Sequence, residues 1–234
     1  MANVIIGFSC CPLTRSAFQV NGHNAFTCYL LPSRGDQKDH YMMDVWDLIN
    51  DGARWHFGVF HPMCTYLTVS AAWAFNDPDF SKYPGVGYHQ RVTKGTLVGK
   101  ARRDARDAAI NEFERLMDLP FPAIIENPAS NFVSKVVGSP RQVLQPYNYG
   151  HDASKATGIW HNRVAVEMNL PLLRPVGLPV LPRYVNGRPR WGNQTDSGQN
   201  RLSPSDDRWL ERLKTYPGIA SAIGTQYGEW LNGK

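Results

Sequence analysis

Two short apolar runs, each followed at once by reactive side chains, constrain the fold of this chain more than any other feature. The first run, Phe57–Phe60, leads into the turn His61–Thr65, which carries Cys64; the second run, Phe121–Ile125, ends at Glu126. Runs of this kind are typical of buried strands. In open α/β sheets, ligands bind at the carboxyl ends of the strands. A thiol and a carboxylate at two such ends can attack and protonate a ring together.

An alternation of strand and helix patterns indicates the fold class. Val4–Ile6 and Ala25–Leu31 are strand-like runs, and Thr14–Val20 between them is compatible with a helix. This βαβ rhythm implies parallel strands. A third strand is expected to end at Met42–Val45, and apolar residues at helical spacing predict a helix over Leu97–Leu119. We therefore expect an α/β fold with a doubly wound, mainly parallel, Rossmann-like sheet.

Length and composition fit one α/β domain with a small appendage. The chain has 234 residues, of which 42% are hydrophobic and 19% charged, enough for a core and without the signature of disorder. We expect a catalytic domain over 1–173, a short irregular strap over 174–205, and C-terminal helices over 206–234 that pack back on it. The helices are expected at about Pro204–Leu213 and Ile219–Leu231.

Features of targeting and redox chemistry point to the cytoplasm. No apolar run approaches the ~20 residues that span a bilayer, and Met1–Ile6 lacks the basic region of a secretion signal. The cysteines are Cys10, Cys11, Cys28 and Cys64, and no two of them form a CxxC pair. We therefore expect reduced thiols and no metal site.

The segment 174–205 combines arginine with aromatic side chains. The formal net charge of the chain is +5, which is compatible with a polyanionic partner. Basic side chains with aromatic ones between them suit phosphate contacts and base stacking. The expected nucleic-acid contacts are Arg174, Arg183, Tyr184, Arg188, Arg190, Trp191 and Arg201. The alternative is an extended strap that only covers the core.

The order of several short motifs resembles that of the DNA cytosine methyltransferases, which methylate carbon 5 of the ring. Pro62–Cys64 resembles their Pro-Pro-Cys turn, and Glu126–Pro128 resembles their Glu-Asn-Val motif. Further along the chain, three segments resemble their Gln-x-Arg-x-Arg, Arg-Leu-Thr-Pro and last motifs: Tyr149–Thr157 with Lys155, Arg201–Pro204 and Ile219–Gly224. The ordered set covers most of the chain and is most similar to the small members found in bacteriophages. It implies a protein of a bacterial or phage-infected cytoplasm.

The same resemblance implies an S-adenosylmethionine pocket. Phe8–Cys10 resembles the first cofactor loop of the family, and Asp44 resembles its acidic residue at the adenine end. The implied pocket consists of Phe8, Ser9, Cys10, Tyr29, Asp44, Val45 and Pro62. Two departures stand out. Cys10–Pro12 replaces the usual glycines, and Tyr29 replaces an acidic residue for the ribose hydroxyls; a phenol donates one hydrogen bond but cannot accept two as a carboxylate does.

The resemblance also implies a mechanism and the residues that perform it, namely Cys64, Glu126, Asn127 and Lys155. The Cys64 thiolate would add to carbon 6 of a cytosine flipped out of DNA. Glu126 would bind ring nitrogen 3 and the exocyclic amine, while Lys155 supplies positive charge. Carbon 5 would take a methyl group from the sulfonium and then lose its proton.

Two other functions remain open. The first is an enzyme that applies the same cysteine and glutamate chemistry with another donor or to a free nucleotide, which Tyr29 slightly favours. The second is a non-catalytic binder of nucleotides or nucleic acid derived from this fold, with a role against a host defence. The presence of both Cys64 and Glu126 argues against the binder.

Overall fold

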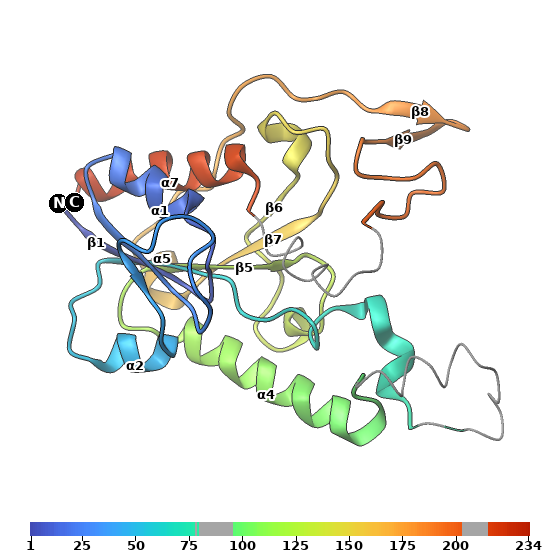
Figure 1. Cartoon of the computed structure of the whole chain (residues 1–234), viewed down its shortest axis with the longest axis horizontal. Helices are drawn as coiled ribbons and strands as arrows, with labels where there is room; N and C mark the ends of the chain where they lie inside the picture. The colour runs from blue at the N-terminus through green and yellow to red at the C-terminus, as the bar shows by residue number, and fades with distance from the viewer. Residues whose placement is uncertain (78, 80–95, 203–214) are drawn as a thin grey trace.

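In a computed structural model, which describes residues 1–77, 79, 96–202 and 215–234, the chain is an α/β protein built on a mixed seven-stranded sheet (Figure 1). The strand order is β3-β2-β1-β4-β5-β7-β6. The strands are β1 Asn3–Gly7, β2 Asn24–Cys28, β3 His40–Tyr41, β4 Phe57–Phe60, β5 Ala123–Pro128, β6 Gln142–Leu144 and β7 Thr157–His161. The first five strands run parallel, and β7 runs antiparallel to both of its neighbours.

Helices and short 3₁₀ turns connect these strands. The α-helices are α1 Leu13–Val20, α2 Val45–Asn50, α4 Gly99–Met117, α5 Arg163–Glu167 and α7 Pro217–Asn232. The 3₁₀ helices are η1 Val69–Phe75, η2 Val133–Lys135 and η3 Pro146–Tyr149. The helix α1 joins β1 to β2, and α4 lies in the connection from β4 to β5. Crossovers of this length return the chain in the same direction, as parallel pairing requires.

Hydrophobic clusters lie on both faces of the sheet, which explains why its central strands are continuous apolar runs. On one face, Phe18 of α1 and Ile223 of α7 pack against Phe57 of β4. On the other face, Leu48 of α2 and Phe113 of α4 belong to the cluster that covers the sheet. Figure 1 shows α1 and α7 on one side of the sheet and α2 and α4 on the other.

The carboxyl ends of β1, β4 and β5 lie side by side in the middle of the sheet. Gly7 is paired with Phe60, and Phe60 with Ile125. The residues that follow these three positions are therefore neighbours along one edge. In open α/β sheets, the crevice used for ligands lies where the strand order reverses, and here the order reverses between β1 and β4. This edge is the place to look for a site.

Several segments differ from the sequence expectations. The third strand ends at Tyr41, and Asp44 is instead the N-cap of α2, because its side chain accepts a hydrogen bond from Trp46 N. The segment 174–205 is not wholly irregular: it contains an antiparallel hairpin of β8 Arg183–Val185 and β9 Arg188–Arg190. Its Asn-Gly turn is a strong hairpin signal. The antiparallel strands β6 and β7 were also not anticipated.

The long helix and the C-terminal helix were predicted within two residues of their observed bounds. The helix expected at Pro204–Leu213 and the second half of the motif Arg201–Pro204 lie outside the described residues. Within the described part of the chain, no helix combines the length and the apolar character needed to cross a membrane.

Candidate active site

The register between β4 and β5 brings His61 and Glu126 together. Because Phe60 is paired with Ile125, the next residues along the two parallel strands, His61 and Glu126, are also side by side. The two side chains meet at 2.6 Å between His61 Nδ1 and Glu126 Oε2. The amide of His61 also donates a hydrogen bond to Gly7 O at 3.1 Å, which holds it against β1. The centre of this edge is therefore a histidine–carboxylate pair.

Lys155 and His61 control the charge of Glu126. Burial raises the pKa of this carboxyl, but the charge of Lys155 and the hydrogen bond and charge of His61 outweigh it and hold the pKa at about 2. Lys155 lies two residues before β7, which pairs with β5 along Glu126. At neutral pH, Glu126 is therefore an ionised hydrogen-bond acceptor.

Asn127 braces the turn that carries Cys64. Its side chain is almost completely buried, and its Nδ2 donates to Pro62 O at 3.0 Å. Asn131 Nδ2 in turn donates to Asn127 Oδ1 and to Pro128 O. This network ties the turn after β4 to the end of β5. It fixes the position of the Cys64 turn relative to Glu126. The role of Asn127 in this structure is therefore to hold the turn in place.

Cys64 is half-buried in this turn and forms no disulfide. Its carbonyl accepts hydrogen bonds from Leu67 N at 3.0 Å and Thr68 N at 3.1 Å. Residues 65–67 form a turn, and the 3₁₀ helix η1 begins only at Val69. Since no helix begins at Cys64, a helix dipole does not act directly on its thiol.

The loop after β1 is held by hydrogen bonds to neighbouring segments. Phe8 has a positive φ of 57°, which is uncommon for a bulky residue and often marks functional sites. Ser9 and Cys10 are buried; Ser9 N donates to Cys28 O, and Cys10 O accepts from Arg34 N at 2.8 Å. Burial raises the pKa of the Cys10 thiol. This thiol is therefore a weak nucleophile compared with an exposed one.

The other residues expected to hold a cofactor lie at the ends of β2 and β3. Tyr29 directly follows β2, and burial, together with Cys10, raises the pKa of its hydroxyl. Asp44 is exposed at the start of α2, whereas Val45 is buried in the core. Because β1, β2 and β3 are parallel neighbours, Phe8, Tyr29 and Asp44 share one edge of the sheet. Val45 lines the core beneath it.

The arginines of the strap mostly bind the strap itself. Arg183 forms an ion pair with Asp196 at 2.8 Å, and Arg190 Nε donates to Asp196 O. Arg201 Nε donates to Gln194 O at 2.8 Å. In the described part of the chain, the side chain of Arg188 has no hydrogen bond or ion pair. Arg188 is thus the arginine of the hairpin that remains available to a partner.

Trp191 attaches the strap to the body of the protein. Its ring stacks on Tyr147 with centroids 4.3 Å apart and planes 12° apart. Its Nε1 donates to Val180 O at 3.3 Å. One face of the ring is therefore already covered, while Tyr184 in β8 remains 71% exposed. Tyr184 offers the more accessible aromatic surface of the hairpin.

The sequence analysis did not identify His61 as a partner of Glu126. The signal was present, because each residue directly follows one of the two apolar runs. Aligning the ends of the runs pairs His61 with Glu126, as the observed register does. A histidine beside a carboxylate at the carboxyl edge is a common element of acid–base sites.

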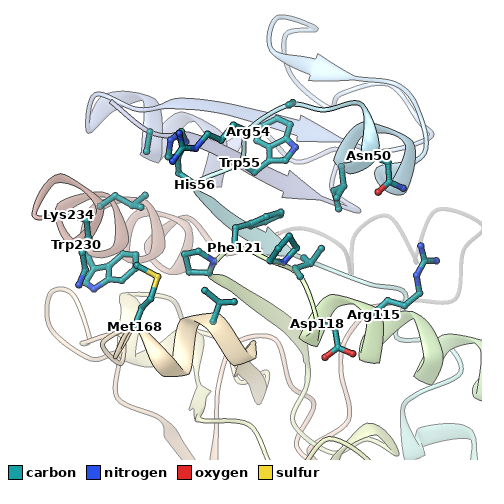
Figure 2. Close-up of a pocket in the computed structure, with 18 of the residues that line it drawn as sticks. Asn50, Arg54, Trp55, His56, Arg115, Asp118, Phe121, Met168, Trp230 and Lys234 are labelled. Carbon is teal, nitrogen blue, oxygen red and sulfur yellow. The ribbon is translucent and has the colours of Figure 1, made fainter.

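A cavity lies at the opposite edge of the sheet (Figure 2). It has a volume of about 1000 Å³. Its lining comes from the segments before β4 and β5 and from the ends of α4 and α7, and includes Arg54, Trp55, His56, Arg115, Phe121 and Trp230. A smaller cavity of about 400 Å³ lies beside α1 and β2. Neither cavity includes Cys64 or Glu126, so cavity size does not indicate the candidate active site.

Comparison with models of protein families gives no match for this chain, and comparison with curated proteins gives no significant match.

Proposed function

We propose that this protein is a pyrimidine carbon-5 methyltransferase that acts on cytosine in DNA, similar to the DNA cytosine methyltransferases. The observation that carries the proposal is the pairing of the Cys64 turn with Glu126 at the ends of neighbouring parallel strands. The order β3-β2-β1-β4-β5 is shared with doubly wound nucleotide-binding sheets. We infer a doubly wound, Rossmann-like methyltransferase fold, with Cys64 as the nucleophile.

In the proposed reaction, the sulfur of Cys64 forms a bond to carbon 6 of the pyrimidine. The π electrons of the ring then move toward carbon 5 and the ring nitrogen, which makes carbon 5 nucleophilic. Ionised Glu126 accepts a hydrogen bond from the exocyclic amine and holds the ring in place. Lys155 offsets negative charge near the ring. Carbon 5 would take a methyl group from the sulfonium of S-adenosylmethionine, whose sulfur keeps the electrons of the broken bond. The proton of carbon 5 would then pass to water, the electron pair left behind would restore the double bond, and Cys64 would leave as a thiolate.

The residues at the ends of β1, β2 and β3 fit S-adenosylmethionine in part. Asp44 keeps an exposed carboxylate that can accept a hydrogen bond from an adenine amine, and Tyr29 offers a half-buried hydroxyl. Phe8 adds an apolar surface from the loop after β1. S-Adenosylmethionine bound there would supply an electrophilic methyl group. The amide of Ser9 already donates to Cys28 O, so it is not available to a ligand.

Isothermal calorimetry with S-adenosylmethionine tests the cofactor. We expect binding by the wild type and at least tenfold weaker binding by Asp44→Ser. Serine caps a helix about as well as aspartate, so this change removes the carboxylate and keeps the start of α2. Asp47→Ser, in the first turn of the same helix, is the matched control and should bind like the wild type. Folded wild-type protein that does not bind at millimolar ligand would contradict a methyl transfer from this cofactor.

A second candidate is the same cysteine and glutamate chemistry on a free nucleotide or with another donor. Two observations favour it: Tyr29 stands where an acidic residue is expected, and Arg183, Arg190 and Arg201 already bind the strap. A product assay with radiolabelled S-adenosylmethionine and either cytosine-containing DNA or deoxycytidine monophosphate distinguishes the candidates. Methylation of the nucleotide alone would support the second.

A further inference from the structure

We propose that His61 is a positioning residue: it fixes the direction and the charge of the Glu126 carboxylate, so that the pyrimidine meets a single oxygen, Oε1. The inference rests on the proposed function, because it assigns the pyrimidine as the ligand of Glu126. It goes beyond that function because none of the motifs that resemble the methyltransferases gives His61 a role.

The first support is geometric. His61 is held from two sides, since its amide donates to Gly7 O and its Nδ1 lies 2.6 Å from Glu126 Oε2. The side chain of His61 is only 10% exposed, and that of Glu126 is 19% exposed. A short contact between two such restricted side chains leaves little rotational freedom. The Oε2 oxygen is therefore committed to His61, which leaves Oε1 for a ligand.

The second support concerns the position of the proton on His61. Its Nε2 is buried and has no hydrogen-bond partner among the described residues. A buried N–H without an acceptor is costly, whereas an N–H that points at a carboxylate is favourable. The proton shared by the pair therefore belongs on Nδ1, and His61 donates to Glu126. A donating histidine keeps the carboxylate ionised.

The third support is the set of charges around Glu126. Among the described residues, the charged or titratable groups that act on it are Lys155, on the side of β7, and His61, on the side of β4. Both favour the ionised form, and together they overcome the effect of burial. An ionised carboxylate can accept hydrogen bonds from the ring but cannot donate one to it. Such a site selects a pyrimidine that presents an N–H, as the 4-amino group of cytosine does.

The experiment compares His61→Ala and His61→Gln with the wild type, in the full chain, by two readouts. The first is the pH titration of the Glu126 carboxyl carbon, followed by ¹³C NMR without substrate. The pKa of Glu126 should rise in His61→Ala, because the hydrogen bond that His61 donates to the carboxylate is lost. His61→Gln should give a smaller rise, because its amide still donates a hydrogen bond.

The second readout is the pH profile of kcat and KM for methyl transfer to a cytosine-containing oligonucleotide. A hydrogen bond to a charged group has a net effect of about 10- to 100-fold, so kcat/KM should fall by about this factor in His61→Ala. The acid limb of the profile should move to higher pH, and His61→Gln should recover part of the loss. A role confined to stability would leave the acid limb where it is.

His56→Gln is the matched control. His56 directly precedes β4, at the opposite edge of the sheet, and its Nδ1 accepts a hydrogen bond from Asn3 N at 3.0 Å. It should match the wild type in both readouts. An unchanged Glu126 titration in both His61 variants overturns the proposal, as does an unchanged kcat/KM in folded His61→Ala. If wild-type protein has no turnover on any pyrimidine, the proposed function fails, while the titration still decides whether His61 sets the charge of Glu126.

Discussion

Cys64 depends on its neighbours for position. Pro62 and Asn127 hold the turn through the hydrogen bond from Asn127 Nδ2 to Pro62 O, and Leu67 N and Thr68 N close it behind the cysteine. No helix begins at this turn, so in the proposed reaction the thiol would be activated by groups at the carboxyl edge. A thiol in a fixed turn, at the same edge of the sheet as an ionised carboxylate, fits the proposed covalent addition to a ring.

Replacing Cys64 with serine tests this residue directly. We expect Cys64→Ser to abolish product, because a serine hydroxyl lacks the nucleophilicity of a thiolate at neutral pH. The fold should be preserved, because the side chain is only half-buried. Turnover and thermal unfolding are the measurements. Cys11→Ala, in the loop after β1, should keep turnover, and full activity of Cys64→Ser would remove covalent catalysis from the mechanism.

At the scale of elements, the contact between α1 and α7 depends on a glycine. A Cβ at Gly224 would lie 2.4 Å from Ala17 Cβ and 2.8 Å from Phe18 N. Only a glycine allows the two helices to approach this closely. Since α7 contributes Ile223 and Tyr227 to the core, this contact holds the C-terminal segment onto the sheet.

Gly224→Ala is therefore expected to destabilise the protein. Overpacking costs about 1–3 kcal/mol, which exceeds the gain of about 1 kcal/mol in helix propensity. The net loss should lower Tm by a few degrees, measured by differential scanning calorimetry. Ser221→Ala, at an exposed position of the same helix, provides the control and should not lower Tm. A Tm for Gly224→Ala at or above that of the wild type would contradict the close contact.

The hairpin β8–β9 is formed locally and presents Arg188 beside its turn. Asn186 and Gly187 have φ values of 50° and 72°, as a tight two-residue hairpin turn requires. Arg183 and Arg190 hold the adjoining loop, so their loss would disturb the strap as well as any binding. The side chain of Arg188 has no such structural contact with any described residue, so its replacement can test binding without disturbing the strap.

Arg188→Ala should weaken binding to DNA without changing stability. If Arg188 contacts a phosphate, the slope of log affinity against log salt concentration should decrease by about 1. Fluorescence anisotropy with a labelled oligonucleotide at several salt concentrations measures this slope. Arg163→Ala, which removes an exposed ion pair with Asp118, should bind like the wild type. Equal salt-dependence slopes for the wild type and both variants would indicate that the strap has only a structural role.

At the scale of the whole molecule, His161 couples folding to pH. Burial, with a further contribution from Arg141, lowers its pKa to about 4. The unfolded chain binds a proton near the ordinary value of about 6.5, so between pH 6.5 and 4 the unfolded state carries more protons than the folded state. The stability that comes from keeping His161 neutral is therefore complete above pH 6.5 and is lost as the pH falls toward 4.

We expect the free energy of unfolding to fall by about 3 kcal/mol across this window because of His161. Urea titrations from pH 8 to 4 measure the dependence. His161→Gln should flatten the slope between pH 6.5 and 4, even if its overall stability is lower. Above pH 7 the two proteins should have parallel curves, because His161 is then neutral in both states. An unchanged slope in the variant would show that another group titrates.

The contribution of Glu126 to folding stability is lost at a lower pH than that of His161. Its folded pKa of about 2 lies below its ordinary value, so its stabilising effect is present at neutral pH and is lost as the pH falls toward 2. The Glu126 window therefore lies below that of His161, and the two meet near pH 4.

The local elements, and the sheet edge at which Cys64 and Glu126 lie, could be predicted from the sequence alone. Apolar runs predicted β1, β4 and β5, and helical spacing predicted α4, because each pattern lies within a few consecutive residues. The same runs put Cys64 and Glu126 after neighbouring strands. The Asn-Gly turn of the hairpin is an equally local signal.

The contacts between distant segments could not be predicted from local patterns. His61 and Glu126 are 65 positions apart, and their contact depends on the register of two strands joined by a long crossover. The stacking of Trp191 on Tyr147 and the antiparallel insertion of β7 beside β5 have the same origin. Such contacts are selected by the packing of the whole core, because a one-residue change of register would turn every side chain to the other face.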